Sequence, residues 1–205
     1  MKNSKLEDTT RVVCYTGHRV ILRPIDVATD LKSCTRWIND PEVNQFIMAQ
    51  GPITESAERE YLEGVGKDPY NIIFAIETLD THRFIGTMGI HRINFVSRFA
   101  TTGSLIGEKD CWGKGFGTDA KMLVLYHAFN ALNLRKINSE VISYNERSAK
   151  CLIKCGYKEE GRRDQVHFRN GTYWDQIQFG IFREQFEPLW QKFSKGLEWY
   201  EKLNK

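Results

Sequence analysis

The sequence lacks any long run of apolar residues. None approaches the roughly 20 consecutive apolar residues that a helix needs to cross a bilayer. Segment 1–11 is polar and contains no apolar core of a signal peptide. We therefore expect a chain that has no membrane partner and that resides in the cytoplasm.

Cysteine is scarce, with five in 205 residues. An odd number without a secretion signal favours free thiols in a reducing compartment. Cys151 and Cys155 stand four apart on a predicted helix, but no His or further Cys lies nearby at the spacing of a metal site. We therefore predict packing roles for both thiols and no bound metal.

Neither sign of charge dominates, because the sequence has 29 Lys and Arg and 26 Asp and Glu, which gives a net charge of +3. The basic residues are spread along the chain, whereas nucleic-acid binders concentrate them on one face. We therefore expect no nucleic-acid partner. The small positive excess would still suit a cofactor that carries several phosphates.

The spacing of apolar residues changes along the chain from a helical period to short apolar segments typical of strands. Apolar residues at helical spacing dominate the first third, and short segments rich in Ile and Phe follow in the middle. Asn170-Gly171 predicts a two-residue hairpin that joins 162–168 to 173–182. The predicted helices are 26–38, 42–47, 54–62, 118–132, 148–155 and 184–203, and the other strands are 18–23, 71–77, 83–90, 102–106 and 136–144.

This order predicts an α+β fold. We expect a loose arm over 1–10, a single domain over 11–186, and a C-terminal helix over 187–205. That helix would pack on its own domain or on a second subunit of a homodimer. A chain of 205 residues with 41% hydrophobic residues is large enough to bury one sizeable core.

A glycine-rich turn lies at the start of one amphipathic helix, where 112–118 reads Trp-Gly-Lys-Gly-Phe-Gly-Thr. Glycines let the backbone approach a ligand, and the free amides of a helix start favour an anion. A P-loop is excluded, because it needs Gly-Lys-Ser/Thr and here Gly115 follows Lys114. A dinucleotide fingerprint fits poorly, because 108–112 separate the glycines from the preceding strand. The turn predicts a phosphate site.

A second segment begins Asn145-Glu-Arg-Ser148 and ends Lys154-Cys-Gly-Tyr157. Together, Gly-x-Gly after a strand and Asn-x-x-Ser followed by Lys-x-Gly-Tyr resemble the two acyl-CoA motifs of the GNAT acetyltransferase superfamily. Segments 37–43, 112–118, 156–161 and 170–175 are similar to the branch that contains the ribosomal-protein N-terminal acetyltransferases. The resemblance covers roughly residues 18–186.

The resemblance implies a mixed, mostly antiparallel sheet of six or seven strands, splayed in the middle and flanked by helices. Acetyl-CoA would lie in the gap as the co-substrate. Ser148 would protonate the departing thiolate, and Asn145 would contact the pantetheine arm. The alternative for both residues is a simple cap at the start of the helix. The implied pyrophosphate ligands are the amides of Lys114, Gly115, Phe116, Gly117 and Thr118, and the implied pantetheine ligands on the preceding strand are Leu105, Ile106 and Gly107.

The implied reaction is direct transfer of an acetyl group to a primary amine. The acceptor could be a protein N-terminus, an amino sugar, a polyamine or an aminoglycoside-like molecule. The alternative is an acyl-CoA-binding sensor or interaction module without turnover. Cys111 lies beside the loop without a visible His partner, so we do not expect a covalent acyl carrier. Asp40 and Glu42 either bind a cationic acceptor or are exposed acids at a helix break.

The sequence leaves open which residue acts as the general base. Many family members carry a Glu on the fourth strand, where this sequence has Thr101 and Thr102. We expect His167 to replace it, because an imidazole changes protonation near neutral pH and some related enzymes carry an acid at this position. A partly exposed strand residue without a catalytic role is an equal alternative, and His91 is a second candidate. We expect Asp175 in a buried hydrogen-bond network.

Overall fold

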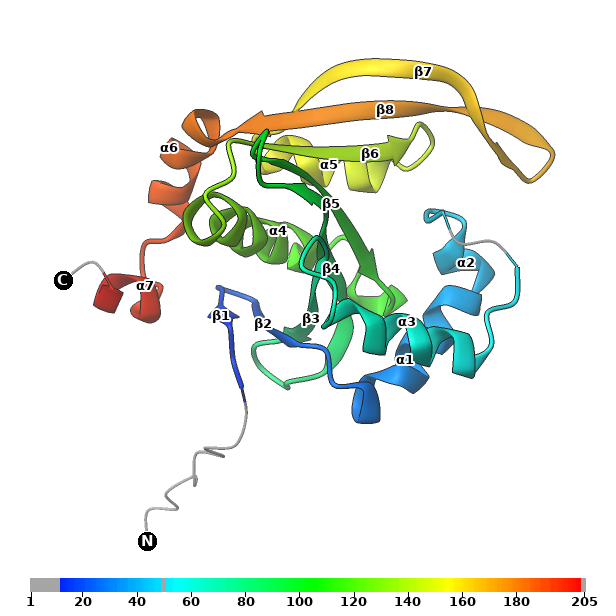
Figure 1. Ribbon diagram of the computed structural model, residues 1–205, viewed down its shortest axis with the longest axis horizontal. Coiled ribbons are helices and arrows are strands. Elements are labelled where there is room, and N and C mark those ends of the chain that lie inside the picture. Colours follow the sequence, from blue (N-terminus) through cyan, green and yellow to red (C-terminus); the bar gives the residue numbers. More distant parts are fainter. Residues whose placement is uncertain (1–11, 49–50, 204–205) are drawn as a thin grey trace, which may run out of the picture.

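The computed structural model describes residues 12–48 and 51–203 (Figure 1). The predicted arm over 1–10 lies outside them. The helices are α1 (Val27–Asn39), α2 (Pro41–Asn44), α3 (Glu55–Val65), α4 (Phe116–Tyr126), α5 (Glu146–Lys154), α6 (Arg183–Phe193) and α7 (Glu198–Leu203). The strands are β1 (Tyr15–Thr16), β2 (Val20–Pro24), β3 (Ile72–Thr78), β4 (Phe84–Asn94), β5 (Phe99–Ile106), β6 (Lys136–Ile142), β7 (Lys158–Arg169) and β8 (Thr172–Phe182).

One sheet runs through the molecule in the order β1-β2-β3-β4-β5-β6-β8-β7. All neighbouring strands are antiparallel except β5 and β6, which are parallel. The α+β fold class is thus confirmed. The described sheet has eight strands rather than six or seven, because the two-residue β1 pairs with β2 and is too short to predict from periodicity.

The sheet is splayed between its two parallel strands. β5 and β6 pair only from Phe99 to Thr101 and from Lys136 to Asn138. Beyond these pairs the strands diverge, so the rest of β5 has no strand neighbour on that side. This divergence creates the space in which the candidate site lies.

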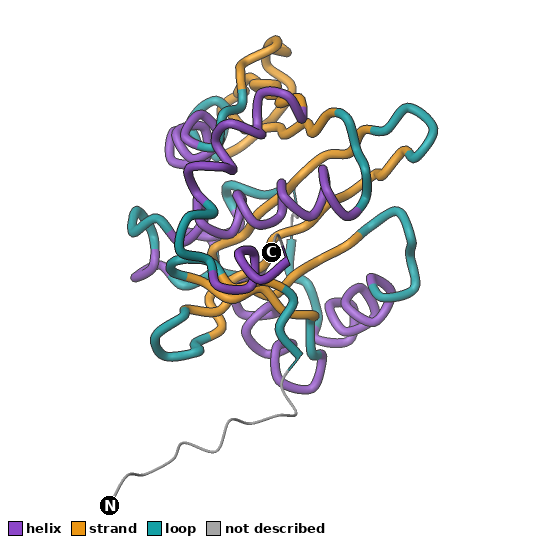
Figure 2. Tube along the Cα trace, turned by 90° about the vertical axis from the view of Figure 1, so that its left-hand side faces the viewer, coloured by secondary structure: helices purple, strands orange, loops and turns teal. Residues whose placement is uncertain are grey.

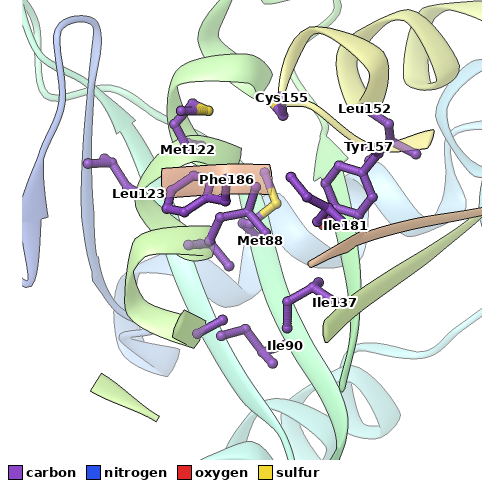
Figure 3. Close-up of a cluster of buried hydrophobic side chains, with 14 of the residues drawn as sticks. Met88, Ile90, Met122, Leu123, Ile137, Leu152, Cys155, Tyr157, Ile181 and Phe186 are labelled. Carbon is purple, nitrogen blue, oxygen red and sulfur yellow. The ribbon is translucent and has the colours of Figure 1, made fainter. Parts of the chain in front are cut away.

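The main core lies between the sheet and α4, which contacts β2, β4, α5 and α6. Figure 3 shows Met122 and Leu123 of α4 close to Met88 of β4 and Phe186 of α6. A smaller cluster around Trp37 and Leu31 holds α1–α3 together at the lower right of Figure 1. Figure 2 shows the strands (orange) as a twisted layer with helices (purple) packed along it.

Local sequence signals explain where several helices begin and end. The Asp26 carboxylate accepts a hydrogen bond from the Ala28 amide at 3.0 Å and caps α1, and Thr54 caps α3 in the same way. The sequence predicts a C-terminal helix that Pro188 or Gly196 could shorten or bend. It is interrupted between α6 and α7 by Gly196, whose φ is +81°, whereas Pro188 lies within α6 without ending it.

The C-terminal helices pack on their own domain. The Trp190 ring of α6 stacks on the Tyr126 ring at the end of α4, with centroids 4.3 Å apart. The Trp199 indole of α7 donates a hydrogen bond to the Thr16 carbonyl at 2.6 Å. None of the helices within 12–48 and 51–203 has the length and apolar character of a membrane span.

Candidate functional site

A cleft of about 730 Å³ opens where β5 and β6 diverge. One wall is β5 from Thr102 to Ile106, and the opposite wall is β6 from Ser139 to Val141 together with the first turns of α5. The glycine turn and residues 46–48 after α2 complete the lining. The two predicted motifs therefore meet at one cavity.

The glycine turn presents free amides to this cleft. Gly113 and Gly115 have φ of +75° and +89°, a backbone conformation that favours glycine, and Gly115 directly precedes α4. The first amides of a helix have no intrahelical acceptor. A Cβ on Gly117 would lie 3.7 Å from Ile106 Cγ1 and 4.0 Å from Cys151 Sγ, so this glycine faces both walls. The arrangement can hold an anion at the positive end of α4.

Asp119 fixes the position of the turn. Its buried carboxylate accepts hydrogen bonds from the amides of His18 at 3.3 Å, Arg19 at 2.9 Å and Val20 at 3.0 Å. A Cβ on Gly17 would collide with the same carboxylate. The start of α4 is thereby held against the start of β2.

Asn145 and Ser148 lie together in the cleft at the start of α5. The Asn145 side-chain oxygen accepts a hydrogen bond from the Ser148 amide at 3.2 Å and caps the helix. The cap leaves the Asn145 amide nitrogen as the donor for a ligand. Ser148 is half-buried, and its hydroxyl is on a residue that lines the cavity.

The predicted cofactor residues divide into two groups. Gly115, Gly117 and Thr118 line the cleft, as do Leu105 and Ile106 of β5. Lys114 and Phe116 belong to the same turn but are not among the lining residues in the described chain.

Gly107 has a structural explanation of its own. Its amide donates to the Ile85 carbonyl at 2.9 Å, and a Cβ there would collide with the Trp37 ring. The cofactor contacts of all these residues stay predictions.

His167 pairs with Trp174 across the hairpin, as predicted. The register of β7 against β8 shifts at a bulge between Arg163 and His167. His167 is buried, at 8% exposed, rather than partly exposed. Its Nε2 lies 3.1 Å from the Gln176 side-chain oxygen. His167 is not among the described residues that line the cleft, and its catalytic role stays a prediction.

Asp175 is hydrogen-bonded but not buried, which corrects the predicted buried network. It accepts from the Gln165 amide at 3.0 Å and from Arg162 at 3.2 Å, and its side chain is 29% exposed. The pKa of this carboxyl is lowered mainly by the hydrogen bond from the Gln165 backbone amide and also by the Arg162 guanidinium. The bulge of β7 turns this part of the hairpin toward solvent.

His91 is not among the described residues that line the cleft and lines a second cavity of about 590 Å³ under α3. Its Nδ1 is 3.1 Å from the Asn71 side-chain oxygen, and burial lowers its pKa.

Asp40 and Glu42 form ion pairs with Lys109 at 3.1 Å and 3.0 Å. The two acids therefore share one cation of this chain, the Lys109 ammonium.

Glu140 and Arg147 are two of the charged residues at the cleft that were not predicted. Glu140 of β6 lines the cavity and pairs with Arg92 at 3.6 Å. The sequence signal that could have identified Glu140 is that it is the single acid on this strand. Arg147 of α5 places its guanidinium carbon 3.8 Å from the centroid of the Trp112 ring. Trp112 itself donates to the Ile106 carbonyl at 2.7 Å, so Arg147 connects the two sides of the cleft.

The cleft carries an excess of positive charge. Lys121, Arg147, Lys150 and Lys154 line it, against Glu140 and Glu146. This balance suits a polyanionic ligand. Within residues 12–48 and 51–203, no three His, Cys, Asp or Glu side chains gather as a metal site would require.

Comparison with known proteins agrees with this geometry. A family model described as an acetyltransferase (GNAT) domain matches residues 19–158. The SPbeta prophage-derived uncharacterized N-acetyltransferase YokL of Bacillus subtilis (strain 168) is 34% identical over 117 residues, which cover 57% of this chain and 59% of that protein. The spermidine N(1)-acetyltransferase of Escherichia coli (strain K12) is 33% identical over 187 residues, which cover 83% of this chain and 90% of that protein.

A solved structure shares the fold. The spermidine N-acetyltransferase from Vibrio cholerae, in complex with CoA and spermine, gives a TM-score of 0.76 at 24% identity and covers 82% of this chain and 98% of that one. The family resemblance is thus confirmed, whereas the finer likeness to the ribosomal-protein branch stays a prediction. With its two motifs at one cleft of a splayed sheet, and with a family model that matches most of its length, this chain belongs to the GNAT family of acetyltransferases.

Proposed function

We propose that this protein transfers an acetyl group from acetyl-CoA to the primary amine of a small molecule, with polyamines as the first class to test. The observation that carries the proposal is the cleft between β5 and β6, which joins the glycine turn to Asn145 and Ser148. The spermidine N(1)-acetyltransferase of Escherichia coli, 33% identical to this chain, supports the choice of acceptor.

The chemistry requires a neutral amine, a polarised thioester carbonyl and a proton for the departing thiolate. The free amides at the start of α4 would hold the pyrophosphate, and the unpaired edge of β5 would align the pantetheine arm. Ser148 would supply the proton to the sulfur from the opposite wall. The cofactor therefore would lie along the divergence of the two strands, with its phosphates at the start of α4.

The direct test is release of CoA thiol from acetyl-CoA in the presence of spermidine, spermine, an N-terminal peptide set, an amino-sugar nucleotide and an aminoglycoside. We expect release with the polyamines. Release with another class alone would reassign the acceptor. Acetyl-CoA binding by calorimetry without release with any amine would favour the sensor alternative.

Replacement of Ser148 by Ala should lower kcat by about 100-fold, because loss of a general acid typically removes that much. The affinity for acetyl-CoA, measured by calorimetry, should change little. Ser143→Ala is the matched control, because Ser143 lies just before α5 and outside the cleft lining. Equal losses of kcat and affinity in Ser148→Ala would refute its role as the acid.

We propose Glu140 as the group that takes the amine proton, because it lines the cleft, with His167 as the alternative from the sequence. The rate falls at low pH when a base becomes protonated, so removal of the base removes this acidic limb from kcat/KM. We expect Glu140→Gln to remove the limb and His167→Gln to retain it. The reverse result would return the role to His167.

A further inference from the structure

Lys121 is a buried amine in the cleft wall that the proposed reaction does not use. It lies one helical turn after Gly117 on α4 and is 1% exposed, yet it lines the cavity. Within the described chain its ammonium makes no hydrogen bond or ion pair, and burial lowers its pKa. An unpaired amine is unfavourable in such a place, so packing alone does not account for it.

Cys151 of α5 lines the same cavity as this lysine, where α4 packs on α5. It follows Ser148 by three residues, which puts both on one face of the helix, and it is half-buried in the same cleft wall. Its Sγ lies 3.5 Å from the Thr118 hydroxyl. The Cys155 thiol, the Thr118 hydroxyl and the charges of Lys121 and Lys154 lower the pKa of Cys151 against the effect of burial.

The other four thiols differ from Cys151 in this respect. Burial raises the pKa of Cys14, Cys34 and Cys111, and the pKa of Cys155 is raised by its hydrogen bond with Cys151 and by burial. Cys155 points into the core near Leu152 and Tyr157 (Figure 3). Cys151 also lines the cleft, whereas Cys34 and Cys155 are buried and do not. Because a reactive cysteine must be accessible as its thiolate, Cys151 is the one favoured for reaction.

We propose that Cys151 is a covalent modification site for low-molecular-weight disulfides, with Lys121 as the cation that stabilises its thiolate. The Cys151 sulfur attacks one sulfur of the disulfide, a new S–S bond forms, and the old S–S bond breaks. The released thiolate carries the electron pair and takes a proton from water. One disulfide replaces another, so no external oxidant is needed.

A group attached to Cys151 would block the cleft beside the glycine turn. The Sγ is 4.0 Å from the position of a Cβ on Gly117, where the proposed pyrophosphate site begins. Modification should therefore prevent acetyl-CoA binding, and bound acetyl-CoA should protect the thiol. This consequence rests on the proposed function, whereas the reactivity of Cys151 does not.

The test uses bis(2-hydroxyethyl) disulfide, a small uncharged probe, on the full chain at neutral pH, with peptide mapping by mass spectrometry. We expect mixed-disulfide formation at Cys151 at least tenfold faster than at Cys14, although Cys14 is exposed. Lys121→Met, which retains the length of the side chain, should slow Cys151 at least tenfold and leave Cys14 unchanged. Equal rates at the two thiols, or a fast Cys151 in Lys121→Met, would overturn the proposal.

A second measurement needs no substitution of Lys121. Saturating acetyl-CoA should slow the reaction of Cys151 at least tenfold and spare Cys14, with binding followed by calorimetry. Binding without protection contradicts the proposed position of the thiol. Absence of binding instead contradicts the proposed function, and the comparison with Lys121→Met still decides on Cys151. Probe-treated wild type should lose acetyl-CoA binding, whereas treated and untreated Cys151→Ser should bind equally.

Discussion

Asp119→Ala should lower the free energy of unfolding by about 4 kcal/mol, because three backbone amides lose a charged acceptor at once. The amides of His18, Arg19 and Val20 would be left without this partner where β2 begins. Urea unfolding should show a lower midpoint with an unchanged m-value. The loss should exceed that of ordinary surface substitutions several-fold.

Two controls separate this effect from a change of net charge. Asp164→Ala removes the same charge from an exposed position on β7 and should change stability little. Asp119→Asn keeps one acceptor oxygen and should lose an intermediate amount. If Asp119→Ala unfolds at the wild-type midpoint, the carboxylate does not anchor the turn.

Gly117→Asp should raise the dissociation constant for acetyl-CoA by about 100-fold, since a carboxylate about 4 Å from a phosphate adds several kcal/mol of repulsion. The side chain fits, because its Cβ would meet only ordinary contacts with Ile106 and Cys151. An acid in the first turn of a helix is favourable, so the melting temperature should not fall. Calorimetry measures the affinity, and differential scanning fluorimetry follows the fold.

The same substitution at Gly64 is the matched control. Gly64 lies in α3 outside the cleft lining, and a Cβ there has no neighbour within 4 Å. Gly64→Asp should bind acetyl-CoA as wild type does. Wild-type affinity in Gly117→Asp as well would place the pyrophosphate elsewhere.

Local signals in the sequence predicted the individual elements of this fold well. Asp26 caps α1, Asn170-Gly171 forms the predicted hairpin turn, and Asn145 caps α5. Each of these features depends on residues within a few positions of one another, so it is visible without knowledge of the tertiary structure.

The placement of side chains across elements could not be predicted in the same way. The bulge before His167 adds residues to β7 only, and its position is set by the pairing with β8 rather than by a local signal. The position of Glu140 in the cleft depends on where β5 and β6 separate, and these two strands are 30 or more residues apart in the sequence. Lys121 and Cys151 likewise line one cavity because α4 packs on α5.

The sheet is continuous in its hydrogen bonding but mechanically it consists of two leaves. β1–β5 form one leaf and β6–β8 the other, and three residue pairs between β5 and β6 form the joint. Each leaf supplies one wall of the cleft, so the angle at the joint sets the width of the slot.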